Sequence, residues 1–274
     1  MPKVRARRAP PVRPLSSHVG TMVMGTRIAV LGAARNIEPY VESVMQNFRA
    51  IRSRFPESEF FIVESDSSDR CLRMLRDHAK DFPGLHVHSL GRLRWRVWGG
   101  RMARLARARN HAYSLVRGKP FDFMVWMDMD DVVESPLDPA ILDARLTAPE
   151  GWAMLTATKA GQYYDIWALR HPTICPFDCI RELSKAAPGD EAARERFVLT
   201  PERLVLEALE TSRFLEVESA FGGLAIVRND QDWGPDPFVG LDAEGKQIIE
   251  WASWCARLRA QGGRVFIDRD LRIG

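Results

Sequence analysis

Five apolar residues run directly into three carboxylates in the stretch Phe123-Met124-Val125-Trp126-Met127-Asp128-Met129-Asp130-Asp131-Val132. The apolar run predicts a buried strand, and carboxylates at its end are costly to bury unless they face water, a cation or a ligand. Asp128 and Asp130 are two residues apart, so in an extended chain they point the same way. Hard oxygen ligands so placed suit Mn²⁺ or Mg²⁺ that carries phosphates. The stretch therefore predicts a metal site at Asp128 and Asp130.

The composition is that of a soluble enzyme preceded by a basic tail. The 274 residues are 46% hydrophobic and 27% charged, which is enough to bury a sizeable core. The net charge is +3, but residues 1–27 hold six positive charges and no acid, so the remainder carries −3. We expect residues 1–26 to be a disordered, Pro-rich tail and residues 27–274 to form a single domain.

The predicted cellular location rests on three features that the sequence lacks: a membrane span, a secretory signal and a disulfide framework. No stretch approaches the ~20 apolar residues of a membrane span, and no apolar run follows the N-terminal charges as in a secretory signal. The four cysteines form no C-x-x-C pair, which fits reduced thiols better than a disulfide framework. We expect a cytoplasmic protein with no nucleic-acid partner, whose membrane contact is at most peripheral, through the basic tail at the inner membrane face.

The first half alternates strands and helices. The predicted strands span 27–32, 59–63, 85–90 and 121–127, and the predicted helices span 38–55, 69–81 and 101–116. This order predicts an α/β fold with a mostly parallel sheet, helices on both faces and ligands beyond the carboxyl ends of the strands. The second half predicts strands at 152–156, 163–169, 214–217, 223–227 and 263–267, and helices at 201–210 and 246–259.

The helix predicted over 101–116 carries an arginine in an apolar stripe. At about 100° per residue, Arg109 falls among Met102, Leu105, Ala106, Tyr113 and Val116. An inward guanidinium needs a carboxylate or phosphate partner, so Arg109 is predicted to support a ligand site, with a purely structural ion pair as the alternative. Four further cationic side chains predict a solvated basic face: Arg104, Arg107 and His111 on the opposite side, and Arg101 at the border.

Six motifs in order resemble one family. They are A-R-N at 34–36, E-S-D-S-S-D at 64–69, A-R-A-R-N at 106–110, D-M-D-D at 128–131, Y-D-x-W-x-x-R at 164–170 and S-x-F-G-G-L-A at 219–225. Together they resemble GT-A-type glycosyltransferases, and more closely the cryptococcal capsule-associated α-1,3-mannosyltransferase group. The resemblance covers residues 27–271. It implies the Rossmann-like fold of nucleotide-diphospho-sugar transferases, with a nucleotide-binding half at 27–132 and an acceptor-side half at 133–274.

The resemblance also implies substrates and site residues. The donor would be a GDP- or UDP-sugar, mannose being one candidate sugar, and the acceptor a saccharide or lipid-linked glycan precursor. Asp128 would lie near the ribose and metal, Asp130 would bind Mn²⁺ or Mg²⁺, and Arg109 would approach the nucleotide or the D-x-D. The other residues implied in donor binding are Ala34, Arg35, Glu64 or Asp66 for the nucleoside, and Gly222 and Gly223 for close backbone approach to the sugar or acceptor.

Two acids are candidates for a catalytic base. Glu250 and Asp165 both follow the D-x-D, where the acceptor side is expected, although Glu250 on a helix could also be a solvated surface acid. Alternation over 163–169 places Asp165 and Trp167 on one face, which suits sugar binding; an Asp165–Arg170 pair is the structural alternative. Relatives have Glu-His where this chain has Glu250-Trp251, so Trp251 either stacks on a sugar or packs in the core. Inversion and retention both stay open.

Three other functions agree less well with the sequence. Residues 128–132 also fit the D-x-D-x-[TV] motif of haloacid-dehalogenase-type phosphatases, but that motif usually ends the first strand, and here three strand–helix units precede it. A nucleotidyltransferase would need a glycine-rich loop after the first strand, where this chain has Gly32-Ala33-Ala34. A non-catalytic carbohydrate-binding protein would leave the D-x-D structural.

Overall fold

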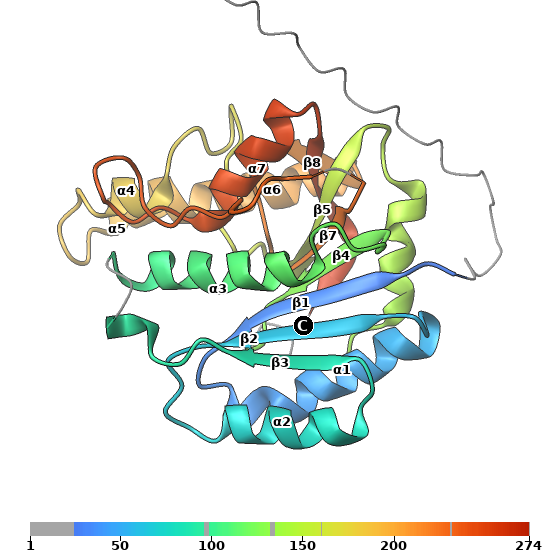
Figure 1. Ribbon diagram of the computed structural model, residues 1–274. Coiled ribbons are helices and arrows are strands. Elements are labelled where there is room, and N and C mark those ends of the chain that lie inside the picture. The colour runs from blue at the N-terminus through green and yellow to red at the C-terminus, as the bar shows by residue number, and fades with distance from the viewer. Residues whose placement is uncertain (1–24, 96–98, 132–134, 160, 231, 274) are drawn as a thin grey trace, which may run out of the picture.

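The fold is a single central sheet between two layers of helices (Figure 1). The computed structural model describes residues 25–95, 99–131, 135–159, 161–230 and 232–273, so the predicted basic tail lies outside the described residues except for 25 and 26. The strands are β1 (Ile28–Ala34), β2 (Glu59–Glu64), β3 (Leu85–Ser89), β4 (Phe123–Met127), β5 (Trp152–Lys159), β6 (Phe214–Val217), β7 (Leu224–Arg228) and β8 (Arg264–Ile273).

In the first half of the chain the helices alternate with the strands. In the second half, most helices come between β5 and β6 in sequence, and one comes between β7 and β8. They are α1 (Val41–Arg54), α2 (Cys71–Asp81), α3 (Gly100–Val116), α4 (Cys179–Leu183), α5 (Glu191–Arg194), α6 (Thr200–Thr211) and α7 (Glu250–Ala260). Short 3-10 or π turns are η1 (Glu38–Tyr40), η2 (Leu93–Trp95), η4 (Pro139–Thr147) and η5 (Glu195–Leu199).

The sheet has eight strands in the order β3-β2-β1-β4-β7-β5-β8-β6. Four of the seven neighbouring pairs are parallel: β1 with β2, β1 with β4, β2 with β3 and β5 with β8. The antiparallel strand β7 lies between β4 and β5 and joins the two halves of the chain in one sheet. The predicted α/β fold with a mostly parallel sheet is confirmed.

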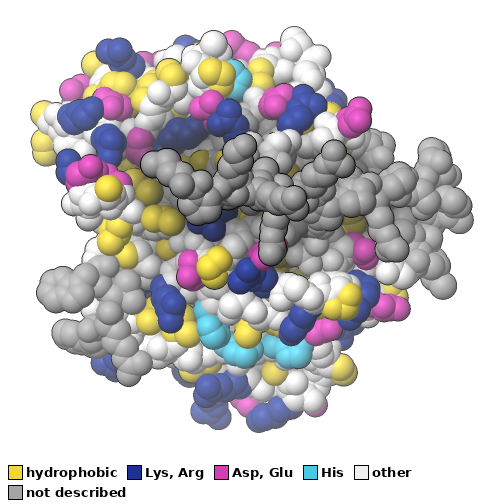
Figure 2. Space-filling view, turned by 45° about the horizontal axis from the view of Figure 1, so that its top comes forward, with side chains coloured by type: hydrophobic (Ala, Val, Ile, Leu, Met, Phe, Trp, Pro, Cys, Tyr) yellow, Lys and Arg dark blue, Asp and Glu magenta, His cyan; other side chains and the backbone are white. Residues whose placement is uncertain are grey.

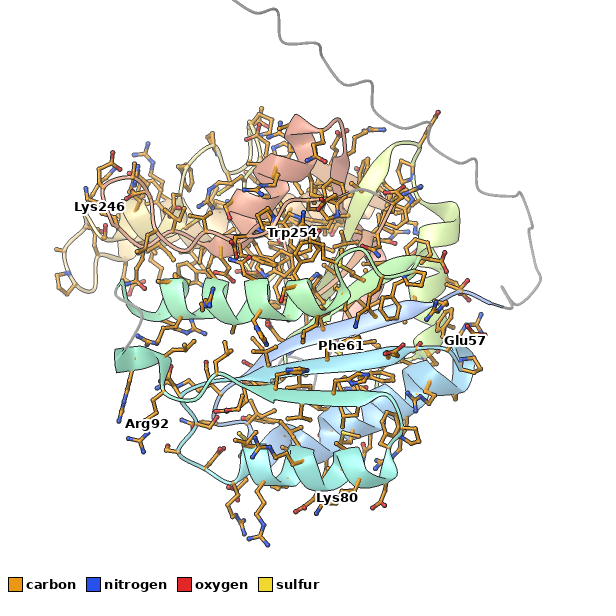
Figure 3. All side chains as sticks on the ribbon, in the orientation of Figure 1. Glu57, Phe61, Lys80, Arg92, Lys246 and Trp254 are labelled. Atoms are coloured by element: carbon orange, nitrogen blue, oxygen red, sulfur yellow. The ribbon has the colours of Figure 1, made fainter. Side chains whose placement is uncertain are left out.

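Alternating burial explains why helices cover both faces. Ile28 and Val30 of β1 pack with α1 and α2, whereas Ala29 and Leu31 pack with α3. On the second face, Trp126 of β4 meets Trp254 of α7 at a ring-centroid distance of 5.5 Å. Figure 3 shows Trp254 inside the layer between α7 and the sheet. Because β1 and β4 are buried on both faces, their ends are held rigidly where polar residues follow.

One predicted strand is wrong. Residues 163–169 form an irregular turn, in which the N–H of Ala168 bonds to Oδ1 of Asp165 at 3.4 Å. An aspartate that accepts a backbone N–H a few residues on favours a turn over an extended chain. The alternation that placed Asp165 and Trp167 on one face therefore does not apply. The last long helix also begins later than predicted, at Glu250.

The surface is mixed in charge, and three histidines gather on one part of it. Figure 2 shows basic and acidic side chains interspersed, with a row of histidines among them. His86 of β3 stacks on Phe61, and His88 lies edge-on to His111 of α3 at 5.5 Å. Within the described ranges, no helix is both long enough and apolar enough to span a membrane. The four cysteines are buried and unpaired.

Candidate active site

A cavity of about 560 Å³ lies at the carboxyl ends of β1, β2 and β4, beneath the N-terminal half of α3 and beside the start of α7. Ligands of open α/β sheets bind at this edge. Eight of the predicted site residues line the cavity: Ala34, Arg35, Asp66, Arg109, Asp128, Asp130, Asp165 and Glu250. Residues far apart in the chain are therefore brought to one site.

The two acids of the D-x-D share one wall of this cavity. The N–H of Asp128 donates to the carbonyl of Gly223 at 2.8 Å, which continues the pairing of β4 with β7 and fixes the position where the strand ends. The Asp128 side chain is 26% exposed, and its Oδ2 accepts a long hydrogen bond of 3.4 Å from the Tyr164 hydroxyl. Asp130 lines the same cavity, whereas Asp131 is exposed and lies outside it.

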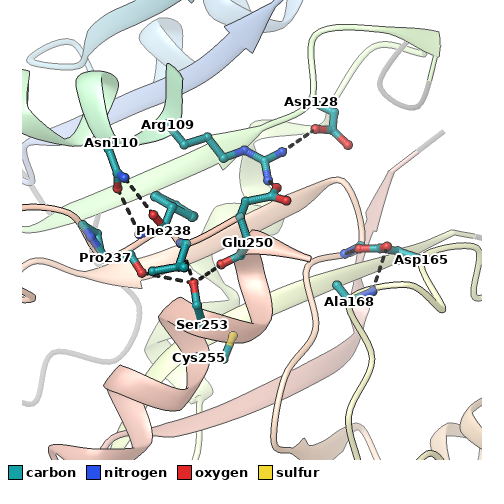
Figure 4. Close-up of polar contacts among 12 residues, drawn as sticks. Arg109, Asn110, Asp128, Asp165, Ala168, Pro237, Phe238, Glu250, Ser253 and Cys255 are labelled. Atoms are coloured by element: carbon teal, nitrogen blue, oxygen red, sulfur yellow. Dashed lines mark hydrogen bonds and ion pairs between the residues drawn. The ribbon is translucent and has the colours of Figure 1, made fainter. Parts of the chain in front are cut away.

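Arg109 joins the D-x-D to Glu250 in the second half of the chain (Figure 4). Its Nη2 lies 3.3 Å from Oδ1 of Asp128, and its Nη1 bonds to Oε1 of Glu250. The guanidinium also lies over the rings of Phe221 and Trp251, at 5.0 and 4.9 Å from their centroids. The inward direction predicted for Arg109 is correct, since the residue is 6% exposed.

The two candidate bases differ in how their oxygens are used. Both oxygens of Asp165 accept backbone N–H groups, from Gly222 at 3.0 Å and from Ala168 at 3.4 Å. Glu250 is 2% exposed, so a solvated surface acid is ruled out; its Oε1 is held by Arg109, and its Oε2 has no hydrogen-bond partner among the described residues. Asp165 does not pair with Arg170, which binds Asp178 instead. Of these two acids, Glu250 is therefore the one with an oxygen that no described residue binds.

The electrostatics of the cavity fit a divalent cation. Burial raises the pKa of Asp128 to about 7; Arg109 opposes the rise, and the neighbouring acids Asp130, Asp165 and Glu250 add to it. Burial also raises the pKa of Asp165. The Arg109 guanidinium contacts two of these acids, Asp128 and Glu250, and Asp128 and Asp130 offer the hard oxygens that Mg²⁺ and Mn²⁺ prefer. Among the described residues no three Asp, Glu, His or Cys side chains form a complete metal cage, so phosphate and water oxygens would complete the shell.

The predicted nucleoside residues divide into two groups. Asp66, with φ of 59°, lines the cavity and accepts the N–H of Arg94 at 3.0 Å. Glu64 does not line it: its carboxylate accepts the N–H of Ser67 and the hydroxyl of Ser89, and so ties together the loops after β2 and β3. Of this pair, only Asp66 is placed to touch a ligand.

The predicted solvated face of the α3 helix is wrong at Arg104. Its Nε lies 3.5 Å from Oδ2 of Asp66, its side chain is only 21% exposed, and it lines the cavity together with Arg101. Arg107 is exposed, as predicted. The physical reason is that the N-terminal half of α3 covers the cavity while the sheet lies beside it, so more than one face of the helix is enclosed.

The two glycines Gly222 and Gly223 stand behind the cavity wall and do not line it. Gly222 has φ of +68°, and a Cβ there would lie 2.0 Å from the carbonyl oxygen of Ala157 in β5. The close approach that requires glycine at Gly222 is thus to β5, and the N–H of the same residue holds Asp165. Their predicted contact with a sugar or acceptor stays a prediction.

Asn110 and Phe221 help to build the site but carry no prediction of their own, whereas Trp251 is expected either to stack on a sugar or to pack in the core. Asn110 bonds with both ends of its amide to the backbone of Phe238, at 2.8 and 2.9 Å, and so fixes the segment beside α7. Trp251 is 2% exposed and stacks on Phe221 at 4.2 Å, so it packs in the core. The A-R-A-R-N and S-x-F-G-G-L-A motifs contain Asn110 and Phe221, but nothing in those motifs indicates which contacts they make.

This combination, an acid pair at the end of a central strand beside a cavity at the same edge of the sheet, agrees with the GT-A architecture that the sequence motifs imply. The family model of glycosyl transferase family 2 matches residues 28–172, more than half of the chain. The chain belongs to glycosyl transferase family 2. The haloacid-dehalogenase-type phosphatase alternative is therefore wrong.

The fold is similar to that of a solved mannosyltransferase. The mannosyltransferase PcManGT from Pyrobaculum calidifontis, in complex with GDP-Man and Mn²⁺, is 18% identical with a TM-score of 0.53; the match covers 92% of this chain and 57% of that one. Glucosyl-3-phosphoglycerate synthase from Mycobacterium tuberculosis, in complex with Mn²⁺, UDP and phosphoglyceric acid, is 16% identical with a TM-score of 0.47, over 92% of this chain and 71% of that one. No curated protein matches the chain.

Proposed function

We propose that this glycosyltransferase is metal-dependent and moves a sugar, with mannose as the first candidate, from a GDP- or UDP-sugar to a saccharide or lipid-linked glycan acceptor. One observation carries the proposal: Asp128 and Asp130 line the same cavity as Glu250, and Arg109 bridges Asp128 to Glu250. The acids that would hold a metal and the acid that would meet an acceptor are thus arranged around one buried cation.

The donor is assigned to the side of the cavity formed by β1, β2 and β4. Ala34, Arg35 and Asp66 line this side and would hold the nucleoside, while Asp128 and Asp130 would bind Mn²⁺ or Mg²⁺. The bound cation would supply the positive charge that stabilises a diphosphate leaving group. Arg35 carries its charge at the same edge and suits a phosphate oxygen.

The acceptor is assigned to the side formed by the turn at 163–169 and the start of α7. Trp167 is 39% exposed and lines the cavity, which suits contact with the apolar face of a sugar ring. Glu250 would take the proton of the acceptor hydroxyl at Oε2, while Arg109 holds Oε1. A carboxylate base on the acceptor side is what direct, inverting displacement requires, so the proposal includes inversion at the anomeric carbon.

Two observations support the finer parts of the proposal. The structural relative PcManGT was crystallised with GDP-Man and Mn²⁺, and the motif pattern resembles the capsule-associated mannosyltransferase group. We also propose that the protein acts in the cytoplasm, with any membrane contact made by residues 1–26.

The test is release of nucleoside diphosphate from a panel of donors, including GDP-mannose, UDP-glucose and UDP-N-acetylglucosamine, with candidate saccharides present. We expect turnover of one donor class that is lost with EDTA and restored by Mn²⁺ or Mg²⁺. Turnover that is unchanged by EDTA would contradict the metal-dependent part of the proposal. NMR of the product would show inversion or retention directly.

A further inference from the structure

Arg109 is held more firmly than an ordinary site arginine. Its side chain is 7% exposed and lies over the rings of Phe221 and Trp251, with the ring of Phe238 at 6.0 Å. A planar guanidinium between aromatic faces keeps its orientation, because turning it would break the cation–π contacts. The group is therefore a fixed positive charge inside the cavity.

The two acids that contact Arg109, Glu250 and Asp128, differ in their burial and in their contact with it. Glu250 is 2% exposed and makes the closer contact, whereas Asp128 is 26% exposed and lies 3.3 Å away through its Oδ1. A buried acid that loses its only cation is left uncompensated, which is costly. Asp128, which faces the open cavity, is therefore the partner that can exchange Arg109 for another cation.

We propose that Arg109 is a built-in cation that competes with the divalent metal for Asp128 and, when the metal takes its place there, remains on Glu250 as its positioning residue. The inference rests on the metal site of the proposed function. It deepens that function by linking the donor and acceptor sides of the site. When the metal binds Asp128, Arg109 loses its contact with Asp128 and keeps its contact with Glu250 on the proposed acceptor side.

Mn²⁺ binding without substrate tests this link, because it does not depend on turnover. The cation is titrated at one fixed pH for all variants, and free Mn²⁺ is followed by electron paramagnetic resonance. Arg109→Gln should bind Mn²⁺ more tightly, on the order of tenfold, because a competing positive charge beside Asp128 is gone. Arg104→Gln is the matched control: it removes the same charge from the same helix and cavity, but contacts Asp66 instead, and should change the affinity by less than about twofold.

A double-mutant cycle separates competition from simple loss of charge. Glu250→Gln removes a negative charge that partly neutralises Arg109, so the fixed guanidinium should compete more strongly with the metal at Asp128. The substitution should therefore weaken Mn²⁺ binding in the wild type and have much less effect in the Arg109→Gln background. Equal effects of Glu250→Gln in both backgrounds would overturn the proposal. If Arg109→Gln fails to fold, the proposal is tested with three other proteins: the wild type, Glu250→Gln and Arg104→Gln. Glu250→Gln must then weaken Mn²⁺ binding by a larger factor than the factor by which Arg104→Gln changes it.

The outcomes also distinguish this inference from the proposed function. Mn²⁺ binding by the wild type, with unchanged or weaker binding by Arg109→Gln, would overturn the role of Arg109 and leave the metal-dependent function standing. Absence of Mn²⁺ binding by the wild type, both alone and with GDP or UDP, would overturn the metal site and this inference together.

Discussion

Replacing Glu250 with Gln tests the assignment of the catalytic base. The substitution keeps the shape of the side chain and an oxygen that can accept from Arg109, but it removes the charge from Oε2, the oxygen without a partner among the described residues. Loss of a general base costs on the order of 10²–10⁴ in the rate of the chemical step. We therefore expect transfer to fall within that range, while nucleotide binding at saturating Mn²⁺ changes little.

The structural cost of Glu250→Gln can be estimated separately. Arg109 loses a charged partner but keeps Asp128 at 3.3 Å, so the loss corresponds to one charge-assisted hydrogen bond, about 1–3 kcal/mol of unfolding free energy. That loss lowers the melting temperature without changing the rate measured on folded protein. Single-turnover transfer, calorimetry of nucleotide binding and thermal unfolding should therefore be measured on the same preparation.

Asp165→Asn is the matched control, since Asp165 is also buried but uses both oxygens to accept backbone N–H groups. We expect it to cost about 1–3 kcal/mol of stability and to slow transfer far less than Glu250→Gln. The reasoning is refuted if folded Asp165→Asn loses transfer by a factor of 10² or more, the usual range for a base, while Glu250→Gln stays near the wild type.

Three further predictions concern the metal, the fold and pH. Asp130→Ala should abolish EDTA-sensitive turnover with the fold intact, whereas Asp131→Asn, on an exposed side chain outside the cavity, should retain most of it; near wild-type turnover in the first variant would disprove the metal role. Gly222→Ala should lower the unfolding free energy by about 1–3 kcal/mol, because its Cβ would lie 2.0 Å from a carbonyl oxygen of β5; an unchanged denaturant midpoint would contradict this. Burial, and then nearby positive charge, lowers the pKa of His88 and of His111, so their contribution to stability is complete above pH 6.5 and is lost as pH falls; thermal melts from pH 7.5 to 5.5 should show a smaller acid loss in His88→Asn.

The first half of the fold could be predicted because its signals are local. The strand ending at Met127 is apolar throughout, and the helix over 41–54 has its apolar residues at regular spacing. Alternation of strand and helix then leaves few topologies, so the edge of the sheet that carries the acids follows from chain order alone. The position of Asp128 and Asp130 at the cavity is a consequence of that order.

The errors arise where tertiary contacts override local pattern. The alternating residues around Asp165 suggest a strand, but hydrogen bonds to Gly222 and Ala168 stabilise a turn instead. A helical projection gives α3 one buried face, yet Asn110 and Arg104 are also enclosed, by the segment beside α7 and by Asp66. Contacts between segments so distant in the chain leave no periodic signal, which is why the ion pair of Arg109 with Glu250 could not be predicted.

The central claim is that Asp128 and Asp130 hold a divalent metal in the cavity where Arg109 contacts both Asp128 and Glu250. A crystal structure of the protein grown with Mn²⁺ and GDP or UDP, with diffraction data collected at the manganese absorption edge, tests it most directly. The claim predicts an anomalous peak within about 2.5 Å of a carboxylate oxygen of both residues and in contact with the diphosphate. Bound nucleotide without such a peak, or a peak elsewhere in the protein, would contradict it.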